Sequence, residues 1–351
     1  MELTVKKAGM LTTVQDLGRW GYQSSGVPVA GAMDLPALRL GNLMVGNETG
    51  AAALEATFMG PELSVSGEGL AVCAGAELGF SVNGREIGSW LNVALKDGDV
   101  ISFKGPKCGC RAYICFAGGV DVPVVMGSRS TYTRAKIGGC EGRALKTGDV
   151  LRTGVQDARW RSAEGFSLPQ ELKPDYKSDR PLKIITGLQQ DAFTEAGLAT
   201  LFGSEYTVTS ESDRMGCRFE GPSVEHVKGA DIVSDAIPLG AVQIPGHGMP
   251  IAMLADRQTT GGYTKVGVLT QASIQALVQK IPGAKVRFER VSMETAVAEL
   301  RAEKMLEDKV AGLRCAWCAK SAAPETVRPL SGRLRITVNG VSYDVTCEEI
   351  R

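Results

Sequence analysis

Histidine is almost missing from this chain: only two of its 351 residues are histidine. His226 lies in the segment SVEHVKG, and His247 lies in the glycine-rich turn PGHGMP. A Ser-His-Asp triad requires a histidine that a carboxylate holds against a nucleophile, and neither segment indicates one. We interpret both as surface or turn residues and expect the chemistry of the chain to proceed without a histidine base.

Three further absences exclude whole classes of function. No GxGxxG opens a helix after a strand, and no GxxxxGK[ST] is present, which argues against a dinucleotide fold and a P-loop. Positive and negative residues balance at 39 each, so the chain as a whole is not charged for binding nucleic acid or an anionic membrane. No apolar run reaches the roughly 18 residues of a membrane span, and the N-terminus lacks the apolar core of a signal peptide. We therefore expect a cytoplasmic protein.

Metal-binding motifs are equally scarce. The sequence has no HExxH, and its nine cysteines are an odd, scattered set, several of them inside apolar strands. Such a set is typical of reduced, buried thiols rather than of a disulfide framework. Cys315 and Cys318 form one isolated pair, with Cys347 as the only further candidate nearby, whereas a structural zinc site takes four ligands. We predict two loop cysteines and no metal.

Glycine, by contrast, is abundant, with 43 residues, and the many turns that this implies favour β structure. From about residue 68 to residue 117, short apolar strands alternate with turn signals. Asn83-Gly84 fits a two-residue hairpin because both positions accept a positive φ angle, and the run from Lys96 to Asp99 marks another turn. This spacing predicts a mainly β fold, a barrel or a sandwich, and argues against a βαβ array.

Only a few helices are expected. Asp34 suits the N-cap of a helix that runs to about residue 46, and Pro36 is tolerated in its first turn. Another helix, over residues 270–281, shows apolar residues at helical spacing and ends at Pro282-Gly283. The remaining predicted helices cover residues 191–202 and 293–309, and two polar stretches, residues 155–180 and 311–332, are predicted as linkers.

Four polar, glycine-rich segments interrupt the strand pattern. Their glycines let backbone N–H groups approach a ligand and form anion-binding nests. Their Ser and Thr residues add hydroxyl donors, and their Arg residues add a planar fork that fits a carboxylate or a carboxyphosphate. A single segment of this kind more often serves only to hold two loops together through an Asp-Arg pair. Four such segments on one chain favour a binding site. They cover residues 12–19, 127–143, 212–216 and 255–263.

The first and third of these segments echo each other. Asp16 and Gly18 are followed by Gly31-Ala32, and Asp213 and Gly216 are followed by Gly240-Ala241. Because the spacings differ, these residues alone leave a tandem duplication and a chance likeness both open.

The order of the polar segments resembles that of one family. The stretches that carry the resemblance are AGMLTTVQDLGRWGYQ, GVPVAGAMD, YICFAGGVDVPVVMGSRST, SESDRMGCR, GAVQIPGHGMPIAMLADRQTTGGYTK and IPGAKVRFERV, and they cover about residues 2–298. On these stretches the chain is identified as a member of the biotin-dependent carboxyltransferase family defined by allophanate hydrolase subunit 2. That family includes the C subunit of 5-oxoprolinase, the antagonist of a histidine-kinase inhibitor, and the carboxyltransferase region of urea carboxylase.

The resemblance implies a mainly β fold of two tandem cyclophilin-like β-barrel domains with a few short helices. We place the first barrel at residues 1–165, the second at residues 180–298 and a tail at residues 299–351. The resemblance also implies two partners, a sister subunit of the allophanate hydrolase subunit 1 type and a lactam-utilisation subunit. The three together form an ATP-dependent 5-oxoprolinase, whose ATP site can lie on another subunit. In urea carboxylase relatives, the equivalent region instead takes carboxylate from carboxybiotin, with biotin supplied by a separate carrier.

Both activities act on a poorly reactive C(=O)–N group and pass through a charged oxygen species. Preorganised N–H, hydroxyl and arginine donors stabilise such a species without a histidine. On the positions that match the family's motifs, we expect one wall of donors and a facing wall that holds the substrate. We assign catalysis to Arg129, Ser130, Thr131, Asp256 and Arg257, and substrate binding to Asp16, Arg19, Arg143, Arg214, Thr259 and Tyr263.

The tail extends beyond the family core. RLRITVNGVSYDVTCEEIR alternates apolar and polar residues around Asn339-Gly340, which predicts a β-hairpin. It resembles the opening strands of a biotin-carrier domain but has no Met-Lys-Met turn, so a carrier remnant and an unrelated hairpin that docks on a partner both stay open.

Three functions of the chain also stay open: a 5-oxoprolinase subunit that helps to cleave 5-oxoproline to glutamate with ATP, a biotin-dependent carboxyltransferase for urea-like or other small amides, and a non-catalytic regulator that binds a kinase-inhibiting sister protein.

Overall fold

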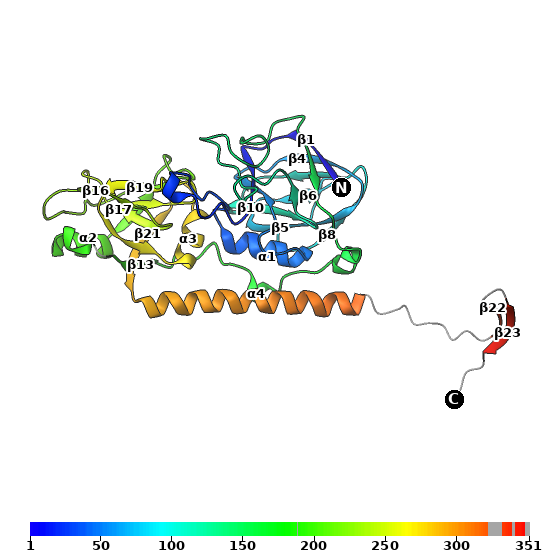
Figure 1. Cartoon of the computed structure of the whole chain (residues 1–351). Helices are drawn as coiled ribbons and strands as arrows, with labels where there is room; N and C mark the ends of the chain where they lie inside the picture. Colours follow the sequence, from blue (N-terminus) through cyan, green and yellow to red (C-terminus); the bar gives the residue numbers. More distant parts are fainter. Residues whose placement is uncertain (188, 322–331, 339–340, 348–351) are drawn as a thin grey trace.

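The computed structural model describes residues 1–187, 189–321, 332–338 and 341–347. Strands dominate these residues, and the α-helices among them number four, so the prediction of a mainly β fold is confirmed. Figure 1 shows two β units side by side, with the orange helix α4 (Met293–Ser321) lying along both. The domain boundaries proposed above stay predictions.

Two facing sheets make up the N-terminal unit. The first has the strand order β11-β12-β1-β4-β9-β6-β7, and the second has the order β2-β3-β10-β5-β8. The first sheet consists of β1 (Glu2–Lys7), β4 (Glu62–Ser66), β6 (Phe80–Val82), β7 (Arg85–Glu86), β9 (Val100–Phe103), β11 (Val120–Asp121) and β12 (Val150–Thr153). The second consists of β2 (Leu11–Gln15), β3 (Ala53–Thr57), β5 (Gly69–Glu77), β8 (Val93–Leu95) and β10 (Cys108–Phe116).

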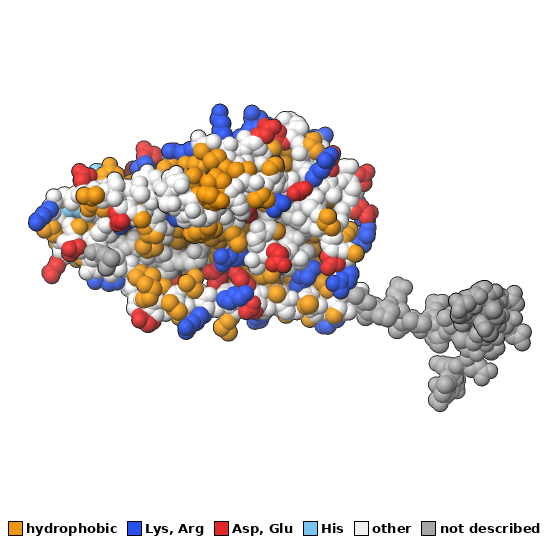
Figure 2. Space-filling model, viewed as in Figure 1, with side chains coloured by type: hydrophobic (Ala, Val, Ile, Leu, Met, Phe, Trp, Pro, Cys, Tyr) orange, Lys and Arg blue, Asp and Glu red, His pale blue; other side chains and the backbone are white. Residues whose placement is uncertain are grey.

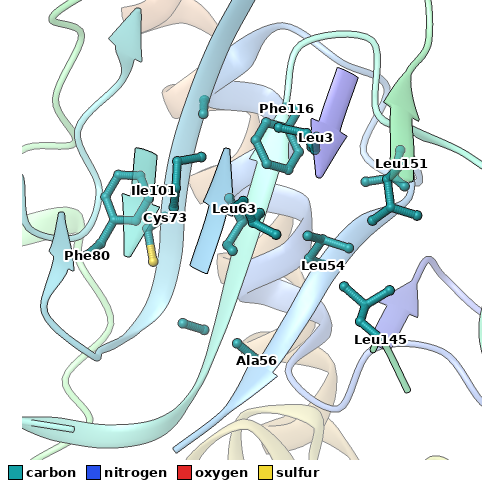
Figure 3. Packing of buried hydrophobic residues seen from close by; sticks show 14 of the residues in the cluster. Leu3, Leu54, Ala56, Leu63, Cys73, Phe80, Ile101, Phe116, Leu145 and Leu151 are labelled. Carbon is teal, nitrogen blue, oxygen red and sulfur yellow. The ribbon is translucent and has the colours of Figure 1, made fainter. Parts of the chain in front are cut away.

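A hydrophobic core fills the space between these sheets (Figure 3). Leu3 and Ile101 come from the first sheet, Leu54 and Phe116 come from the second, and all four are fully buried. The Asn83-Gly84 hairpin between β6 and β7 is confirmed, with positive φ angles of 51° and 76° at its two turn residues. The glycine-marked turns therefore deliver short strands that each contribute one apolar face to this core.

Helix α1 (Leu35–Val45) covers the outer face of the second sheet, and its predicted caps are confirmed. The Asp34 side chain accepts a hydrogen bond from the backbone N–H of Ala37 at 3.1 Å, and Gly46 ends the helix in the left-handed conformation. Gly41 lets the helix approach the sheet closely, because a Cβ at this position would lie 2.8 Å from the Cβ of Ala74. The second sheet is therefore buried on both faces.

A closed barrel forms the second unit, with the strand order β13-β20-β17-β18-β15-β14-β21 and a parallel pairing of β13 with β21. Met33 of the first unit inserts into the hydrophobic core of this barrel. The barrel strands are β13 (Leu182–Thr186), β14 (Glu205–Val208), β15 (Gly216–Glu220), β17 (Ala241–Gln243), β18 (Ile251–Met253), β20 (Lys265–Leu269) and β21 (Lys285–Val291). A separate ribbon pairs β16 (Asp231–Ala236) with β19 (Thr260–Tyr263).

Two short helices accompany the barrel. Thr270 caps α3 (Gln271–Val278), so this helix lies within the predicted range 270–281. In the predicted range 191–202, a 3-10 turn, η4 (Gln190–Ala192), precedes α2 (Glu195–Gly203), whose N-cap is Thr194. The other 3-10 turns are η1 (Gln23–Ser25), η2 (Trp160–Ala163) and η3 (Gln170–Leu172), and the last two lie in the predicted linker 155–180.

Helix α4 corrects two sequence predictions. It is 29 residues long and continues to Ser321, beyond the predicted end at residue 309, so the linker predicted for residues 311–332 is wrong for residues 311–321; residues 322–331 lie outside the described part. Tertiary packing explains the extension, because Val310 is fully buried against the layer formed by α1 and the second sheet. Cys315 and Cys318 consequently lie on this helix and not in a loop.

Polar contacts fasten α4 to both units. Lys183 of the barrel strand β13 pairs with Glu299 at 2.7 Å, and Arg39 of α1 pairs with Glu303 at 3.0 Å. Near the other end of the helix, Trp317 donates its indole N–H to the carbonyl of Glu164 at 3.1 Å.

Among the described residues, no helix combines the length and apolar character that crossing a membrane requires.

In the tail, β22 (Gly332–Val338) and β23 (Val341–Cys347) pair antiparallel, which confirms the predicted hairpin. Its turn, Asn339-Gly340, lies outside the described residues. Eight of the nine cysteines have described side chains, and all eight are free thiols.

Two glycine substitutions test the packing of α1. Gly41→Ala places a Cβ 2.7 Å from the Sγ of Cys115, so we expect overpacking to lower the free energy of unfolding by about 1–3 kcal/mol. Gly312 of α4 is exposed and nothing lies within 4 Å of the equivalent Cβ, so Gly312→Ala should raise stability by up to ~1 kcal/mol. Urea denaturation measures both. Equal effects of the two substitutions would contradict the close contact at Gly41.

Candidate functional site

Asp16 joins the first two polar segments. Its carboxylate accepts hydrogen bonds from the hydroxyl groups of Ser128 at 2.7 Å and Ser130 at 2.5 Å, and from the backbone N–H of Arg129 at 2.6 Å. It also accepts from the N–H of Gly18 at 2.8 Å, which closes a turn. We call Asp16, Ser128, Arg129 and Ser130 the Asp16 turn. A single buried carboxylate therefore fixes two loops that lie more than a hundred residues apart in sequence.

Arg19 is fully buried beside the Asp16 turn. One of its Nη atoms donates to the carbonyl of Ser130 at 2.6 Å, whereas its Nε and its other Nη have no hydrogen-bond partner in the described part of the chain. Burial lowers the pKa of Arg19, and the charges of Asp16 and Asp256 oppose that change. Gly138 allows this packing, because a Cβ there would lie 2.7 Å from an Nη atom of Arg19.

Arg214 joins the third and fourth polar segments and links them to the first unit. Its Nε and one Nη atom each donate to Asp256 at 3.0 Å, and its other Nη atom pairs with Glu55 of β3. It also donates to the carbonyl of Gly31 at 2.6 Å. Burial by itself lowers the pKa of Arg214, but the charges of Asp256 and Glu55 outweigh it and raise the pKa above the usual value. Burial raises the pKa of Asp256, against the opposing charge of Arg214.

Glu55 extends this arrangement into the first unit. It accepts hydrogen bonds from the hydroxyl of Tyr113 at 2.7 Å and from the backbone N–H of Met33 at 2.8 Å. The Tyr113 oxygen in turn accepts from the N–H of Asp34 at 2.7 Å. The carboxylate of Asp34 accepts from the side-chain amide of Gln279 at 2.8 Å. We call the connected side chains the junction network: Asp34, Glu55, Tyr113, Arg214, Asp256 and Gln279.

Asp34 lies between Tyr113 and Gln279 in the junction network, and its carboxyl group has a shifted pKa. Burial raises its pKa to about 6, although hydrogen bonds from Gln279, the Ala37 backbone and Tyr176 favour the ionised form. The Gln279 amide oxygen also accepts from the backbone N–H groups of Cys110 and Arg111, at 3.0 and 2.9 Å. The two units therefore meet through a continuous buried polar contact as well as through Met33.

Several predicted donors have partners within the chain. The Arg129 side chain donates to the carbonyl of Val122 at 2.9 Å, and the Thr131 hydroxyl donates to the carbonyl of Val14 at 3.0 Å. Arg143 is engaged elsewhere: it forms a two-point pair with Asp149, at 2.7 and 2.9 Å, and lowers the pKa of that carboxyl. The structure does not bring Arg143 into contact with the Asp16 turn, and the predicted roles of these residues stay predictions.

Two pockets flank Gln258 where the units meet. The first, which we call the apolar pocket, has a volume of about 540 Å³ and is bounded by Trp20 and Val29 on one side and by Ile237 on the other. Arg257 and Thr259, both predicted site residues, line it. Figure 2 shows a group of hydrophobic side chains on the surface in the region where the two units of Figure 1 meet. Burial lowers the pKa of Arg257 to about 10, and its Nε donates to the carbonyl of Ile237 at 2.9 Å.

The second pocket, which we call the polar pocket, has a volume of about 410 Å³. Arg134 reaches it from the first unit, and Tyr263, a predicted substrate-binding residue, lines it from the ribbon β16–β19. Its other lining residues come from the barrel and its loops: Glu211, Asp213, Met215, Gly216, Arg218, Gln243, Pro245, His247, Ile251, Met253 and Gln258. Within the described ranges, no group of three or more His, Cys, Asp or Glu side chains is arranged to hold a metal ion.

Sequence reasoning missed several residues of this region. Glu55, Tyr113 and Gln279 of the junction network were not predicted, and neither was Gln243 of the polar pocket. A signal for Glu55 was available, because it interrupts the apolar run AAALEATF, in which a charged residue needs a buried partner. Gln243, in GAVQIPG, carries no comparable signal, because an isolated glutamine on a strand is usually solvent-exposed.

Comparisons with known proteins agree with this architecture. Residues 25–290 match the family model "Carboxyltransferase domain, subdomain A and B". The chain is 35% identical to the C subunit of 5-oxoprolinase from Escherichia coli over 84% of its own length and 93% of that protein. Among solved structures, the Kluyveromyces lactis urea carboxylase superimposes with a TM-score of 0.83 at 27% identity, covering 98% of this chain and 32% of that one. The K. lactis urea amidolyase gives a TM-score of 0.82 at 29% identity, covering 88% and 20%.

The fold is thus that of a carboxyltransferase domain. The chain belongs to the family of carboxyltransferase domains, subdomains A and B, as the resemblance of its motifs predicted.

The buried pair of Glu55 and Arg214 provides a stability test. Glu55→Gln leaves the Arg214 charge with one carboxylate instead of two, so we expect the free energy of unfolding to fall by about 3 kcal/mol or more. The matched control is Glu86→Gln, which removes an exposed carboxylate that also pairs with two cations, Lys104 and Lys107. Chemical denaturation should show no measurable effect of the control. Equal stability of the two variants would contradict the importance of the buried pair.

The raised pKa of Asp34 gives a pH test. The pKa of Asp34 rises from 3.8 to about 6 on folding, so the folded state binds the proton more tightly than the unfolded state does. The free energy of unfolding therefore contains a favourable contribution at low pH, and this contribution is lost as the pH rises from about 4 to about 6. The full change is about 3 kcal/mol. Asp34→Asn removes this titration, so its stability relative to the wild type should rise across that window in denaturation curves recorded at several pH values. A difference that does not vary with pH would contradict the assignment.

Proposed function

We propose that this chain is the carboxyltransferase-type subunit of an ATP-dependent 5-oxoprolinase, which opens the lactam of 5-oxoproline to give glutamate. The observation that carries the proposal is the match to the C subunit of E. coli 5-oxoprolinase, which spans 84% of this chain and 93% of that protein. A match that nearly fills both chains supports an equivalent role in a complex. We further propose that it works in the cytoplasm with a sister subunit of the allophanate hydrolase subunit 1 type and with a lactam-utilisation subunit.

The chemistry of the junction supports this reaction. Opening a lactam requires stabilisation of negative charge on an amide oxygen, which fixed N–H, hydroxyl and guanidinium groups provide. The Asp16 turn and Arg214 use their own hydroxyl, N–H and guanidinium groups in hydrogen bonds within the chain, and so fix the loops beside the two pockets, where Arg257 lines the apolar pocket and Arg134 lines the polar pocket. We assign the Asp16 turn, Arg19 and Arg214 an orienting role, and Arg257, Thr259 and Tyr263 direct contact with ligands in the two pockets. ATP is bound by another subunit in this proposal.

One observation favours a second function, carboxyl transfer from biotin to a small amide. The structural match to K. lactis urea carboxylase covers 98% of this chain and therefore extends into the β22–β23 hairpin. By sequence, the match to a putative urea carboxylase from Emericella nidulans covers 95% of this chain, whereas the match to the C subunit of E. coli 5-oxoprolinase covers 84%. In this second function the same junction stabilises the oxyanion that forms on biotin or on the amide, and biotin is supplied by a separate carrier.

Reconstitution distinguishes these functions. The chain is mixed with its sister and lactam-utilisation subunits, 5-oxoproline and ATP, and glutamate is measured by chromatography. We expect glutamate only when all three proteins and ATP are present. Stoichiometric assembly without glutamate would contradict the oxoprolinase proposal, and carboxylation of urea-like amides by carboxybiotin would then establish the second function.

Arg129 tests whether the chain contributes to turnover or only to assembly. Arg129→Gln retains the backbone N–H that binds Asp16 but removes the cation and its hydrogen bond to the Val122 carbonyl. Because a displaced loop misplaces the groups around it, we expect normal assembly and a loss of glutamate formation of roughly tenfold or more. Arg152→Gln is the control, because Arg152 is an exposed residue that pairs with Glu2. Unchanged turnover in Arg129→Gln would support a non-catalytic, regulatory role for this loop.

A further inference from the structure

The polar pocket contains a buried carboxamide that has no partner. Gln243 is 3% exposed, and its amide nitrogen, Nε2, is buried with no hydrogen-bond partner among the residues that the structure describes. Buried amides are normally hydrogen-bonded, because an unsatisfied one costs about 1–3 kcal/mol. A side chain kept in this state at the wall of a pocket indicates a ligand that supplies the missing bonds.

Strand geometry explains why Gln243 faces the pocket. Val242 and Ile244, its neighbours in sequence, belong to the hydrophobic core of the barrel. Because successive side chains on a strand point to opposite faces, Gln243 lies on the outer face of β17. Gly261 packs closely against it: a Cβ there would lie 3.2 Å from the Nε2 of Gln243, 2.9 Å from the Nε2 of Gln258 and 2.6 Å from the Cδ1 of Ile237. The side chains of Gln243 and Gln258, which both line the polar pocket, therefore lie close to each other beside Gly261.

The charges around the pocket leave one cation unpaired. Arg134 is exposed and forms no salt bridge within the described part of the chain, although it lines the pocket. By contrast, Arg218 lies 3.9 Å from Glu211, and the Asp213 carboxylate accepts hydrogen bonds from the N–H groups of Met215 and Gly216. Lys265, directly opposite Gln243 in the β17–β20 pairing, lies 3.3 Å from Asp235. Arg134 is thus the cation available to an anionic ligand.

From these observations we propose that the polar pocket is the binding subsite for a small lactam that carries a carboxylate, with Gln243 pairing with the lactam amide and Arg134 with the carboxylate. The identity of the lactam as 5-oxoproline rests on the proposed function. A lactam holds its N–H and C=O on the same edge, and a carboxamide can donate to the one and accept from the other. A guanidinium provides the complementary fork for a carboxylate. The volume of about 410 Å³ is within the usual range for small-molecule sites.

The subsite can be tested by calorimetric binding to the full chain. The four probes are 5-oxoproline, 2-pyrrolidinone, proline and urea. Comparing them separates the contribution of the lactam group to binding from that of the carboxylate. We expect 5-oxoproline to bind more tightly than 2-pyrrolidinone, which lacks the carboxylate, and more tightly than proline, which lacks the lactam carbonyl. Gln243→Met, close in shape but without hydrogen-bonding groups, should weaken both lactams roughly tenfold or more. Arg134→Met should weaken 5-oxoproline and leave 2-pyrrolidinone unchanged.

Matched controls separate recognition from folding. Gln170→Met changes an exposed glutamine that is not part of the pocket and should bind all probes as the wild type does. Gln243→Glu preserves the size and polarity of the side chain but removes its N–H donors, so it should also lose lactam binding while the thermal midpoint shows that the barrel is folded. This second variant keeps the test decisive if Gln243→Met unfolds.

The results of these binding measurements distinguish failure of the proposed subsite from failure of the proposed function. Unchanged 5-oxoproline affinity in folded Gln243→Met or Gln243→Glu, equal weakening of both lactams by Arg134→Met, or binding of urea alone would each overturn the subsite. Absence of binding by the wild-type chain would overturn it as well. If the chain binds 5-oxoproline through Gln243 and Arg134 but the reconstituted complex releases no glutamate, the subsite stands and the proposed function fails.

Discussion

One buried guanidinium holds the two halves of this protein together. Arg214 projects from the barrel unit and pairs with Asp256 of its own unit and with Glu55 on a strand of the other. Removing three charged groups from water is favourable only when each finds well-placed partners. Here Tyr113 and the Met33 backbone complete the hydrogen bonds of Glu55. The relative placement of the two units therefore depends on side chains that have few alternatives once they are buried.

The rest of the site follows from this placement. Loops distant in sequence meet because Asp16 binds Ser128 and Ser130 on one side of the junction, and Arg214 binds Asp256 on the other. These hydrogen bonds occupy most of the hydroxyl, N–H and guanidinium donors of the polar segments that the sequence motifs indicated. The groups left to contact ligands, such as Gln243 and Arg134, lie around the two pockets beside Gln258. Motif residues such as Asp16 and Arg214 therefore build the frame, whereas we propose that Gln243 and Arg134 face the ligand together with Arg257, Thr259 and Tyr263.

Sequence patterns anticipated the local structure better than the long-range contacts. The Asn83-Gly84 hairpin, the Asp34 cap and the mainly β fold depend on nearest-neighbour geometry, which composition and spacing express directly. Helix α4 ran past its predicted end because the burial of Val310 against a distant layer outweighed a locally weak helix signal. The pairing of Glu55 with Arg214 joins residues on separate units, and no local pattern specifies such a partner.

A structure of the full chain with 5-oxoproline bound tests the account most directly, because it locates the ligand independently of turnover. We expect the lactam in the polar pocket, with its amide edge against Gln243 and its carboxylate against Arg134, and with the junction network unchanged. A ligand in the apolar pocket, or one held by Arg143 away from the junction, would contradict it.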